Sequence, residues 1–175
     1  MGKFVDIKKE YDNFYMSEIK NGKLLAKDTC VGFWGPSVSD EVYQAFRKLS
    51  LGRFTNFLDL GSGDGKVTLM AALFCKNSTG IEYDPILTGK AIDIRDKLQI
   101  TNAKFINDDF FNHDISAYDV IFHAPDQPLH RGVEDKLIGE LKGKLIIHGH
   151  HFHPSYLKKE RSFKVNDTLF SVYSK

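Results

Sequence analysis

Glycines and carboxylates stand together in one short stretch of this chain and have the spacing of a ligand-binding loop. The stretch contains Asp59, Gly61, Gly63, Asp64 and Gly65. Apolar residues lead into it from position 54, and an apolar run at 67–74 follows it, which is the pattern of a strand, a tight loop and a helix. Glycines let a backbone approach a ligand with no Cβ in the way, and the amides of a first helical turn can bind polar groups. The loop is therefore predicted to bind a small molecule.

The spacing and the two acids indicate which small molecule. A dinucleotide loop has the pattern G-x-G-x-x-G, whereas this loop has G-x-G-x-G. Asp59 and Asp64 would repel a pyrophosphate, but they suit a ligand with an ammonium group and no phosphate, such as S-adenosylmethionine (SAM). At this motif the sequence resembles the class I SAM-dependent methyltransferases. The resemblance implies that SAM is the cofactor and that these residues contact it: Asp59, Gly61, Ser62, Gly63 and Gly65.

A second acid supports this interpretation. The segment 78–83 reads as a buried strand that ends at Glu82, seventeen positions after Gly65. In a Rossmann-type fold a carboxylate near this position binds the ribose hydroxyls. The alternative is a solvated strand end. The resemblance assigns Glu82 to the ribose and places Tyr83 against the adenine face.

The third predicted strand, 103–107, leads into Asp108, Asp109 and Phe110. By resemblance, an acid here accepts a hydrogen bond from the adenine amino group, and the amide of the next residue contacts a ring nitrogen. We assign these roles to Asp109 and Phe110, with Asp108 as the alternative acid. One acid of the pair is also expected to cap the turn.

Candidates for the chemical step follow the fourth and fifth predicted strands, 117–123 and 144–148. Methyl transfer from a sulfonium requires a deprotonated, aligned nucleophile, so an acid or imidazole at the ligand edge of the sheet could take its proton. Asp126, His123 and His148 lie at or just beyond these strand ends. Asp126 could equally be a loop carboxylate with no catalytic role. Base and glutamine N-methyltransferases have a different loop here, which argues against those substrates.

Four histidines lie within six residues, at positions 148, 150, 151 and 153. They could hold a transition metal, but the cysteines that often complete such sites are absent from this stretch. Polar loop residues are the favoured interpretation, and we expect no metal. Cys30 and Cys75 are expected to be reduced core residues.

Residues 1–35 are expected to form a helix or hairpin that packs on the domain, with a flap over the ligand as the alternative. Asn21-Gly22 marks a turn. Trp34, the only tryptophan, either closes the core or belongs, with the residues up to Ser37, to a segment over the methionine end of SAM. Ser37 is expected to cap a helix at 38–49.

Alternating strands and helices predict an α/β fold: a doubly wound, Rossmann-like sheet of seven strands, mostly parallel, with a C-terminal antiparallel hairpin at 161–173. Further helices are expected at 84–98, 134–141 and 154–160. The predicted division is an N-terminal helical or flap segment, 1–35, and a methyltransferase domain, 36–175. Through Gly35-Pro36-Ser37 and the Gly80-Ile81-Glu82 strand end, the chain is loosely similar to small protein-lysine methyltransferases that lack a SET domain.

Composition limits the partners. The chain has 175 residues, 42% hydrophobic and 27% charged, with a formal net charge of +1, so nucleic acid is a less favoured partner than a protein or small-molecule methyl acceptor. Neither a signal peptide nor a run long enough to span a membrane is visible, so we expect a cytoplasmic protein without a membrane partner. The alternatives to a methyltransferase are a non-catalytic SAM-binding module and another Rossmann nucleotide-binding protein, such as an oxidoreductase.

Overall fold

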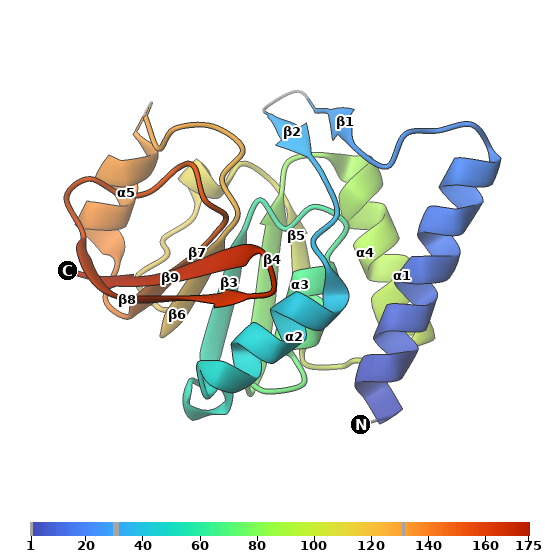
Figure 1. The fold of residues 1–175 in the computed structure, drawn as a ribbon, viewed down its shortest axis with the longest axis horizontal. Helices are drawn as coiled ribbons and strands as arrows, with labels where there is room; N and C mark the ends of the chain where they lie inside the picture. The colour runs from blue at the N-terminus through green and yellow to red at the C-terminus, as the bar shows by residue number, and fades with distance from the viewer. Residues whose placement is uncertain (1, 30–31, 131) are drawn as a thin grey trace.

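A mixed sheet of seven strands forms the centre of this computed structural model, which describes residues 2–29, 32–130 and 132–175. The strand order is β5-β4-β3-β6-β7-β9-β8 (Figure 1). The first five strands in this order are parallel, and β9 and β8 are antiparallel additions. The strands are β3 (Asn56–Leu60), β4 (Asn77–Glu82), β5 (Ala103–Asn107), β6 (Val120–His123), β7 (Lys144–His148), β8 (Lys158–Val165) and β9 (Thr168–Ser174). The predicted fold class is confirmed.

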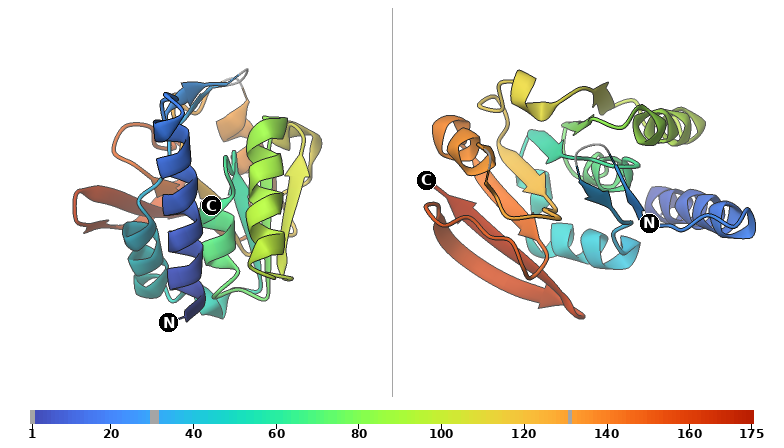
Figure 2. Two further views of the ribbon diagram at one scale, coloured as in Figure 1. Left: turned by 90° about the vertical axis from the view of Figure 1, so that its right-hand side faces the viewer. Right: turned by 90° about the horizontal axis from the view of Figure 1, so that it is seen from above.

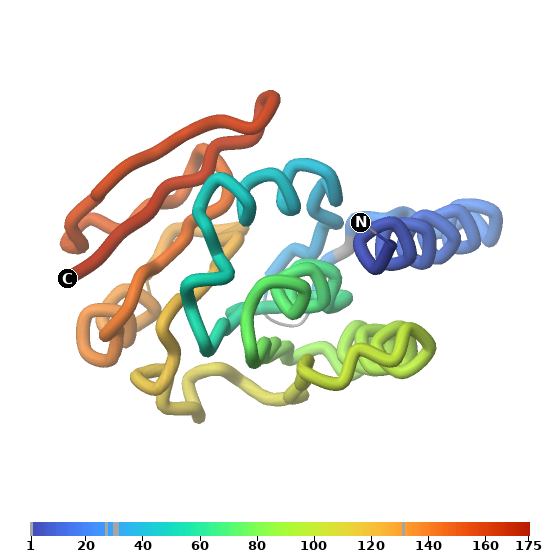
Figure 3. Tube along the Cα trace, turned by 90° about the horizontal axis from the view of Figure 1, so that it is seen from below, coloured from blue at the N-terminus to red at the C-terminus, as the bar shows by residue number. Residues whose placement is uncertain are grey.

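Helices cover both faces of the sheet (Figures 2 and 3). They are α1 (Gly2–Lys20), α2 (Ser39–Lys48), α3 (Lys66–Ala71), α4 (Pro85–Lys97) and α5 (Val133–Glu140). One apolar core contains residues of α1 to α4, and a second core on the opposite face contains Leu137 of α5. Four of the five residues of β3 are buried, as expected for a parallel strand covered on both sides.

Local sequence explains the start of α4. Asp84 is its N-cap, and the Asp84 carboxylate accepts hydrogen bonds from the amides of Ile86 and Leu87 at 2.8 and 3.1 Å. Pro85 occupies the first helical position, where its missing N–H costs nothing. The predicted start of this helix is confirmed.

The start of α2 differs from the prediction. Its N-cap is Val38, with no side-chain cap, and the helix begins at Ser39. Ser37 instead contributes its main-chain carbonyl, which accepts a hydrogen bond from Lys66 Nζ. Ser37 is therefore not the cap, because it lies one residue before the N-cap position.

The helix predicted at 154–160 is wrong. Ser155 and Tyr156 lie in a bend whose amides donate to the Glu134 carboxylate at 2.5 and 2.8 Å, and β8 begins at Lys158. Pairing of Lys158 with Ser174 of β9 extends the backbone, so sheet pairing overrides local propensity. The predicted C-terminal hairpin is confirmed, and β8 forms the outer edge of the sheet with basic side chains along it.

The N-terminal segment contains both a helix and a hairpin. Helix α1 ends before a turn in which Gly22 has a φ of +74°. The chain then forms a two-stranded antiparallel hairpin of β1 (Lys27–Asp28) and β2 (Phe33–Trp34). Cys75 is buried as expected, while Cys30 lies outside the described residues. None of the described helices has both the length and the apolar character needed to cross a membrane.

Candidate functional site

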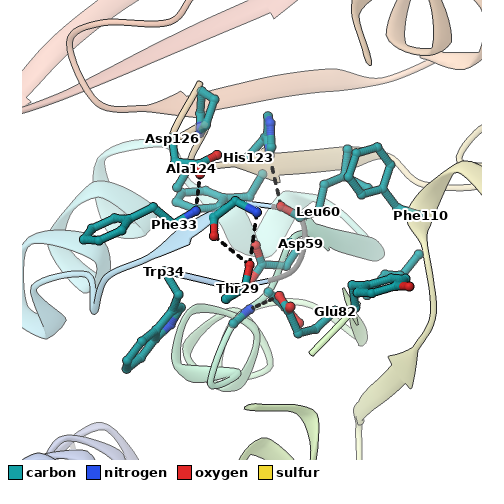
Figure 4. A pocket seen from close by; sticks show the side chains of 18 of the residues that line it. Thr29, Phe33, Trp34, Asp59, Leu60, Glu82, Phe110, His123, Ala124 and Asp126 are labelled. Atoms are coloured by element: carbon teal, nitrogen blue, oxygen red, sulfur yellow. Dashed lines mark hydrogen bonds between the residues drawn. The ribbon is translucent and has the colours of Figure 1, made fainter. Parts of the chain in front are cut away.

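A cavity of about 610 Å³ lies at the carboxyl ends of the central parallel strands. The glycine-rich loop after β3, the ends of β4, β5 and β6, and the N-terminal hairpin all contribute to its lining (Figure 4). Ligands of open α/β sheets bind at this edge. The fold therefore brings together segments from the beginning and the middle of the chain.

Most of the residues predicted from the sequence line this cavity. They are Asp59, Gly61, Ser62, Gly63, Glu82, Tyr83, Asp108, Asp109, Phe110, His123 and Asp126. Gly65 and His148 are not among the lining residues. Gly65 has a φ of +81°, and a Cβ there would lie 2.4 Å from the Ala91 side chain and 2.7 Å from the Phe105 ring. Glycine at this position therefore lets the loop pack against α4 and β5.

The His148 ring lies away from the cavity. Its centroid is 5.8 Å from that of Phe122 and 5.1 Å from that of Phe170. Burial lowers the pKa of His148 to about 4, although the charge of Glu41 opposes the shift. The structure therefore places this histidine in an aromatic environment rather than beside the other two catalytic candidates.

The glycine-rich loop is fixed to the end of β4. The amides of Gly61 and Ser62 both donate to the carbonyl of Ile81 at 3.0 Å. The amide of Gly63 donates to Glu82 Oε2 at 2.8 Å, and the amide of Asp84 donates to Glu82 Oε1 at 2.9 Å. The Glu82 carboxylate is thus held at the cavity wall by two main-chain donors.

Asp59 lies beneath the loop and is 3% exposed. Its Oδ2 accepts a hydrogen bond from Thr68 Oγ1 at 2.9 Å. Burial raises the pKa of the Asp59 carboxyl to about 7; the hydrogen bond from Thr68 opposes the shift, and the charges of Glu82 and Asp64 add to it. A cation in the cavity would find its counter-charge at Asp59.

As expected, one acid of the pair after β5 caps the turn that follows, and it is Asp109, while Asp108 accepts other hydrogen bonds. Asp109 Oδ1 accepts from the amide of Phe111 at 2.9 Å, and Asp108 Oδ1 accepts from the amide of Asp109 at 2.7 Å. Asp108 Oδ2 lies 3.0 Å from His113 Nε2. The assignment of the adenine amino group to Asp109 stays a prediction. The ring of Phe110 stacks on that of Phe111 with centroids 4.8 Å apart.

His123 and Asp126 lie together at one end of the cavity, and Glu82 lies at the other (Figure 4). His123 Nδ1 is 3.0 Å from the carbonyl oxygen of Leu60, so Nδ1 carries the proton and donates it to this hydrogen bond. Burial lowers the pKa of His123, which favours a neutral ring whose basic atom is Nε2.

The Asp126 carboxylate accepts a hydrogen bond from the amide of Phe33 in β2. Gly32 makes this contact possible, because a Cβ there would lie 2.5 Å from Asp126 Oδ2. Trp34 lines the cavity beside the glycine-rich loop, and a Cβ on Gly63 would lie 2.5 Å from Trp34 Nε1. The N-terminal hairpin is therefore part of the cavity wall.

Sequence reasoning missed Phe33 and Lys66, which also line the cavity. Lys66 follows the third glycine directly, and this adjacency was the available signal. Its contacts come from α1 and from Ser37, which no local pattern indicates.

Two of the histidines after His148 have hydrogen-bond partners of their own. His150 Nε2 is 2.6 Å from the carbonyl oxygen of Asp167, and His153 Nδ1 is 2.9 Å from the Tyr173 hydroxyl. Within the described ranges, no three histidine, cysteine or acidic side chains are grouped so that they could hold a metal ion.

A curated lysine methyltransferase resembles this chain in sequence, although no protein-family model matches it. The relative is a lysine N-methyltransferase of Caenorhabditis elegans that is named for one of the subunits of ATP synthase. The two proteins are 33% identical in a match that covers 63% of this chain and 57% of the relative. The chain thus spans little more than half the length of this curated relative.

Solved structures share the fold. An RNA methyltransferase from Salinibacter ruber, in complex with S-adenosyl-L-homocysteine, has a TM-score of 0.64 and 24% identity, covering 79% of this chain and 92% of that one. The putative methyltransferase yhhF from Escherichia coli has a TM-score of 0.58 and 19% identity, covering 74% and 81%. The resemblance inferred from the glycine-rich motif is confirmed: this chain has the fold of the class I, seven-stranded SAM-dependent methyltransferases.

Proposed function

We propose that this protein is a SAM-dependent methyltransferase that modifies the side-chain amine of a protein lysine. The observation that carries the proposal is the Glu82 carboxylate at the cavity wall, held by the amide of Gly63 at 2.8 Å. This contact sets a fixed acceptor beside a glycine-rich loop that carries no phosphate-binding pattern. The fold and the lysine methyltransferase relative support the same activity.

The chemistry of the lining residues fits SAM. Glu82 offers carboxylate oxygens to the ribose hydroxyls, and buried Asp59 offers a negative charge to the ammonium group. Tyr83 and Phe110 supply flat apolar faces for the adenine, and Asp109 supplies an acceptor for its amino group. A cavity of about 610 Å³ is in the range of small-molecule sites. The bound cofactor would supply an electrophilic methyl group on a sulfonium.

The opposite end of the cavity would receive the acceptor. An amine must lose a proton before it attacks a methyl group, and neutral His123 has a basic Nε2 for this role, directly or through one water. The exposed Asp126 carboxylate would attract and orient the cationic form of the amine. The aromatic side chains of Phe33 and Phe111 line the same cavity, and aromatic faces favour an alkyl chain that ends in a cation.

Transfer of radiolabelled methyl groups tests the proposal. The purified protein is incubated with labelled SAM and a cell extract, and the label is followed into protein, RNA and small molecules. We expect label in protein, recovered as methyllysine after hydrolysis. Glu82→Ala should abolish most of the transfer, whereas Glu160→Ala, on the outer strand β8, should leave it unchanged.

Other outcomes would contradict defined parts of the proposal. Labelled material that nuclease digests would show that the substrate is RNA and not a protein lysine. SAM binding without transfer to any fraction would identify a non-catalytic SAM-binding module. A thermal shift with NAD but none with SAM would contradict the cofactor assignment.

A further inference from the structure

We propose that helix α1 is part of the cofactor site and that Tyr15 and Lys66 are positioning residues for the glycine-rich loop. The proposal rests on the proposed function, in which this loop binds SAM. Three side chains carry it, and we refer to them together as the tyrosine clamp: Tyr11, Tyr15 and Lys66.

Both tyrosines of the clamp donate hydrogen bonds to one residue of the loop. The Tyr15 hydroxyl donates to Asp64 Oδ2 at 2.5 Å, and the Tyr11 hydroxyl donates to the main-chain carbonyl of Asp64 at 2.7 Å. Asp64 is 4% exposed, and a buried carboxylate requires hydrogen-bond donors and an opposite charge. Besides the Tyr15 hydroxyl, the amide of Lys66 donates to Asp64 Oδ1 at 3.2 Å. Helix α1 therefore contributes to the support of the loop at Asp64, through the Tyr15 hydroxyl on the carboxylate and the Tyr11 hydroxyl on the main-chain carbonyl.

Lys66 supplies an opposite charge: burial raises the pKa of Asp64, and the charge of Lys66 opposes this shift. Its ammonium nitrogen lies 4.7 Å from the ring centroid of Tyr15 and 5.6 Å from that of Tyr11. The same nitrogen donates a hydrogen bond to the carbonyl of Ser37. Lys66 is 3% exposed, and the two rings and the carbonyl compensate for its loss of water. Lys66 therefore joins α1, the loop and the segment that precedes α2.

The segment from Trp34 to Ser37, which Lys66 contacts through the carbonyl of Ser37, also lines the cavity. Ser37 lies three residues after Trp34, whose indole packs directly against Gly63. The clamp thus restrains the loop at Asp64 and, through Ser37, the wall formed by Trp34. Gly61, Gly63 and Gly65 all have positive φ angles, and a glycine-rich loop loses much backbone entropy when it is ordered. Fixing the loop before the ligand arrives spares that entropy at the binding step.

Tyr15→Phe isolates the hydrogen bond to Asp64 and keeps the ring. We expect the Kd and KM for SAM to rise about tenfold, as for the loss of one hydrogen bond to a charged group, while kcat at saturating SAM stays within about twofold. Lys66→Met should also raise the Kd and the KM for SAM. Trp34 is the only tryptophan, so its fluorescence in the absence of SAM should shift to longer wavelength in both variants as the segment loosens.

Tyr43→Phe is the matched control. The Tyr43 ring stacks on Phe4 of α1 with centroids 4.0 Å apart, at the other end of the helix from Tyr15. We expect wild-type SAM affinity and wild-type Trp34 emission. Thermal unfolding of each variant verifies that it is folded. Wild-type affinity and emission in both Tyr15→Phe and Lys66→Met would overturn the proposal, and so would an equal loss in Tyr43→Phe.

Amide hydrogen exchange separates this proposal from the proposed function. If the wild-type protein binds no SAM, the proposed function fails, but exchange at residues 61–66 still reports on the clamp. Faster exchange there in Tyr15→Phe, with no change in Tyr43→Phe, would support positioning of the loop by α1. Equal exchange in all three proteins would overturn it.

Discussion

The amide of Phe33 donates a hydrogen bond to the carboxylate of Asp126, although 93 positions separate the two residues. This contact joins the N-terminal hairpin to the loop after β6 across one end of the cavity (Figure 4). Asp126 therefore has a structural partner besides the catalytic role proposed for it. A useful variant at Asp126 therefore removes the proposed catalytic role and keeps the hydrogen bond to Phe33.

Asp126→Asn removes the charge but keeps an oxygen that can accept from Phe33. We expect turnover to fall by about tenfold or more, with SAM affinity within a factor of about three, because the carboxylate would act on the acceptor and not on the cofactor. Steady-state kinetics with the unmethylated protein substrate measure turnover, and calorimetric titration with SAM measures the affinity for the cofactor. If Asp126→Asn instead keeps the wild-type rate at every pH from about 6 to about 9, a range that begins near the pKa of histidine and approaches that of an amine, then Asp126 serves only the contact with the hairpin.

Glu82→Ala should weaken SAM binding by about 1 to 3 kcal/mol, since the ribose hydroxyls would lose a buried acceptor. Glu82→Gln keeps one side-chain oxygen that can accept the hydrogen bond from the amide of Gly63. This variant therefore tests ribose binding while the glycine-rich loop keeps its contact with position 82. Isothermal titration calorimetry provides the affinities. If both variants bind SAM as tightly as the wild type, the ribose assignment is wrong.

Gly63→Ala and Gly61→Ala form a matched pair, because both glycines have positive φ angles, +55° and +69°. A Cβ at Gly63 would lie 2.5 Å from Trp34 Nε1, whereas a Cβ at Gly61 meets no described group within 4 Å. Both substitutions strain the backbone, but only Gly63→Ala should also displace Trp34. We expect the larger loss of SAM affinity and a changed tryptophan emission for Gly63→Ala. Equal effects would show that the indole contact is unimportant.

SAM affinity should increase as the pH rises through about 7, where Asp59 titrates. Below this pH the carboxyl is protonated and must release its proton before it can balance a cationic ligand, so binding is weaker there. Titration calorimetry in buffers of different ionisation enthalpy would detect the released proton. Asp59→Asn should flatten the profile, and an unchanged profile would place the counter-charge elsewhere.

His148 should make the fold sensitive to acid. Its pKa is lowered to about 4, below the value of about 6.5 expected in the unfolded chain. The unfolded state therefore binds the proton first, and the free energy of unfolding should fall as the pH drops from about 6.5 towards 4, by about 1 to 3 kcal/mol. Urea unfolding at several pH values measures this slope. His148→Phe should remove much of it, and the same slope in the variant would assign acid sensitivity to other groups.

The register of β6 and β7 explains why His148 does not lie beside His123 in the cavity. His123 pairs with Ile147, so His148 lies one residue further along its strand. Side chains alternate between the faces of a sheet, and a shift of one residue reverses the side. The sequence indicated that both histidines end a strand, but register depends on pairing between strands that are distant in the chain.

The same distinction applies elsewhere in the fold. Asp84-Pro85 predicted the start of α4 because capping is a local interaction. Residues 154–160 were predicted as a helix from local features, yet the amides at Ser155 and Tyr156 bind Glu134, and β8 pairs with β9. The contacts of Lys66 with Tyr15 and Ser37 are equally non-local. The glycine-rich motif and the fold class were therefore accessible from the sequence. For residues 1–35 a flap over the ligand was only the alternative, and the distant contacts that hold this segment in the cavity wall were not indicated.

Strand β8, at one end of the sheet, is rich in basic residues. Four of its eight residues are basic, Lys158, Lys159, Arg161 and Lys164, and among the described strands only β9 pairs with it. A second copy of this protein approaching edge to edge would place like charges opposite one another and lose their hydration. Repulsion of this kind protects an open backbone edge from continuing into a fibre. We therefore expect β8, at the end of the strand order opposite β5, to disfavour edge-to-edge pairing of two copies.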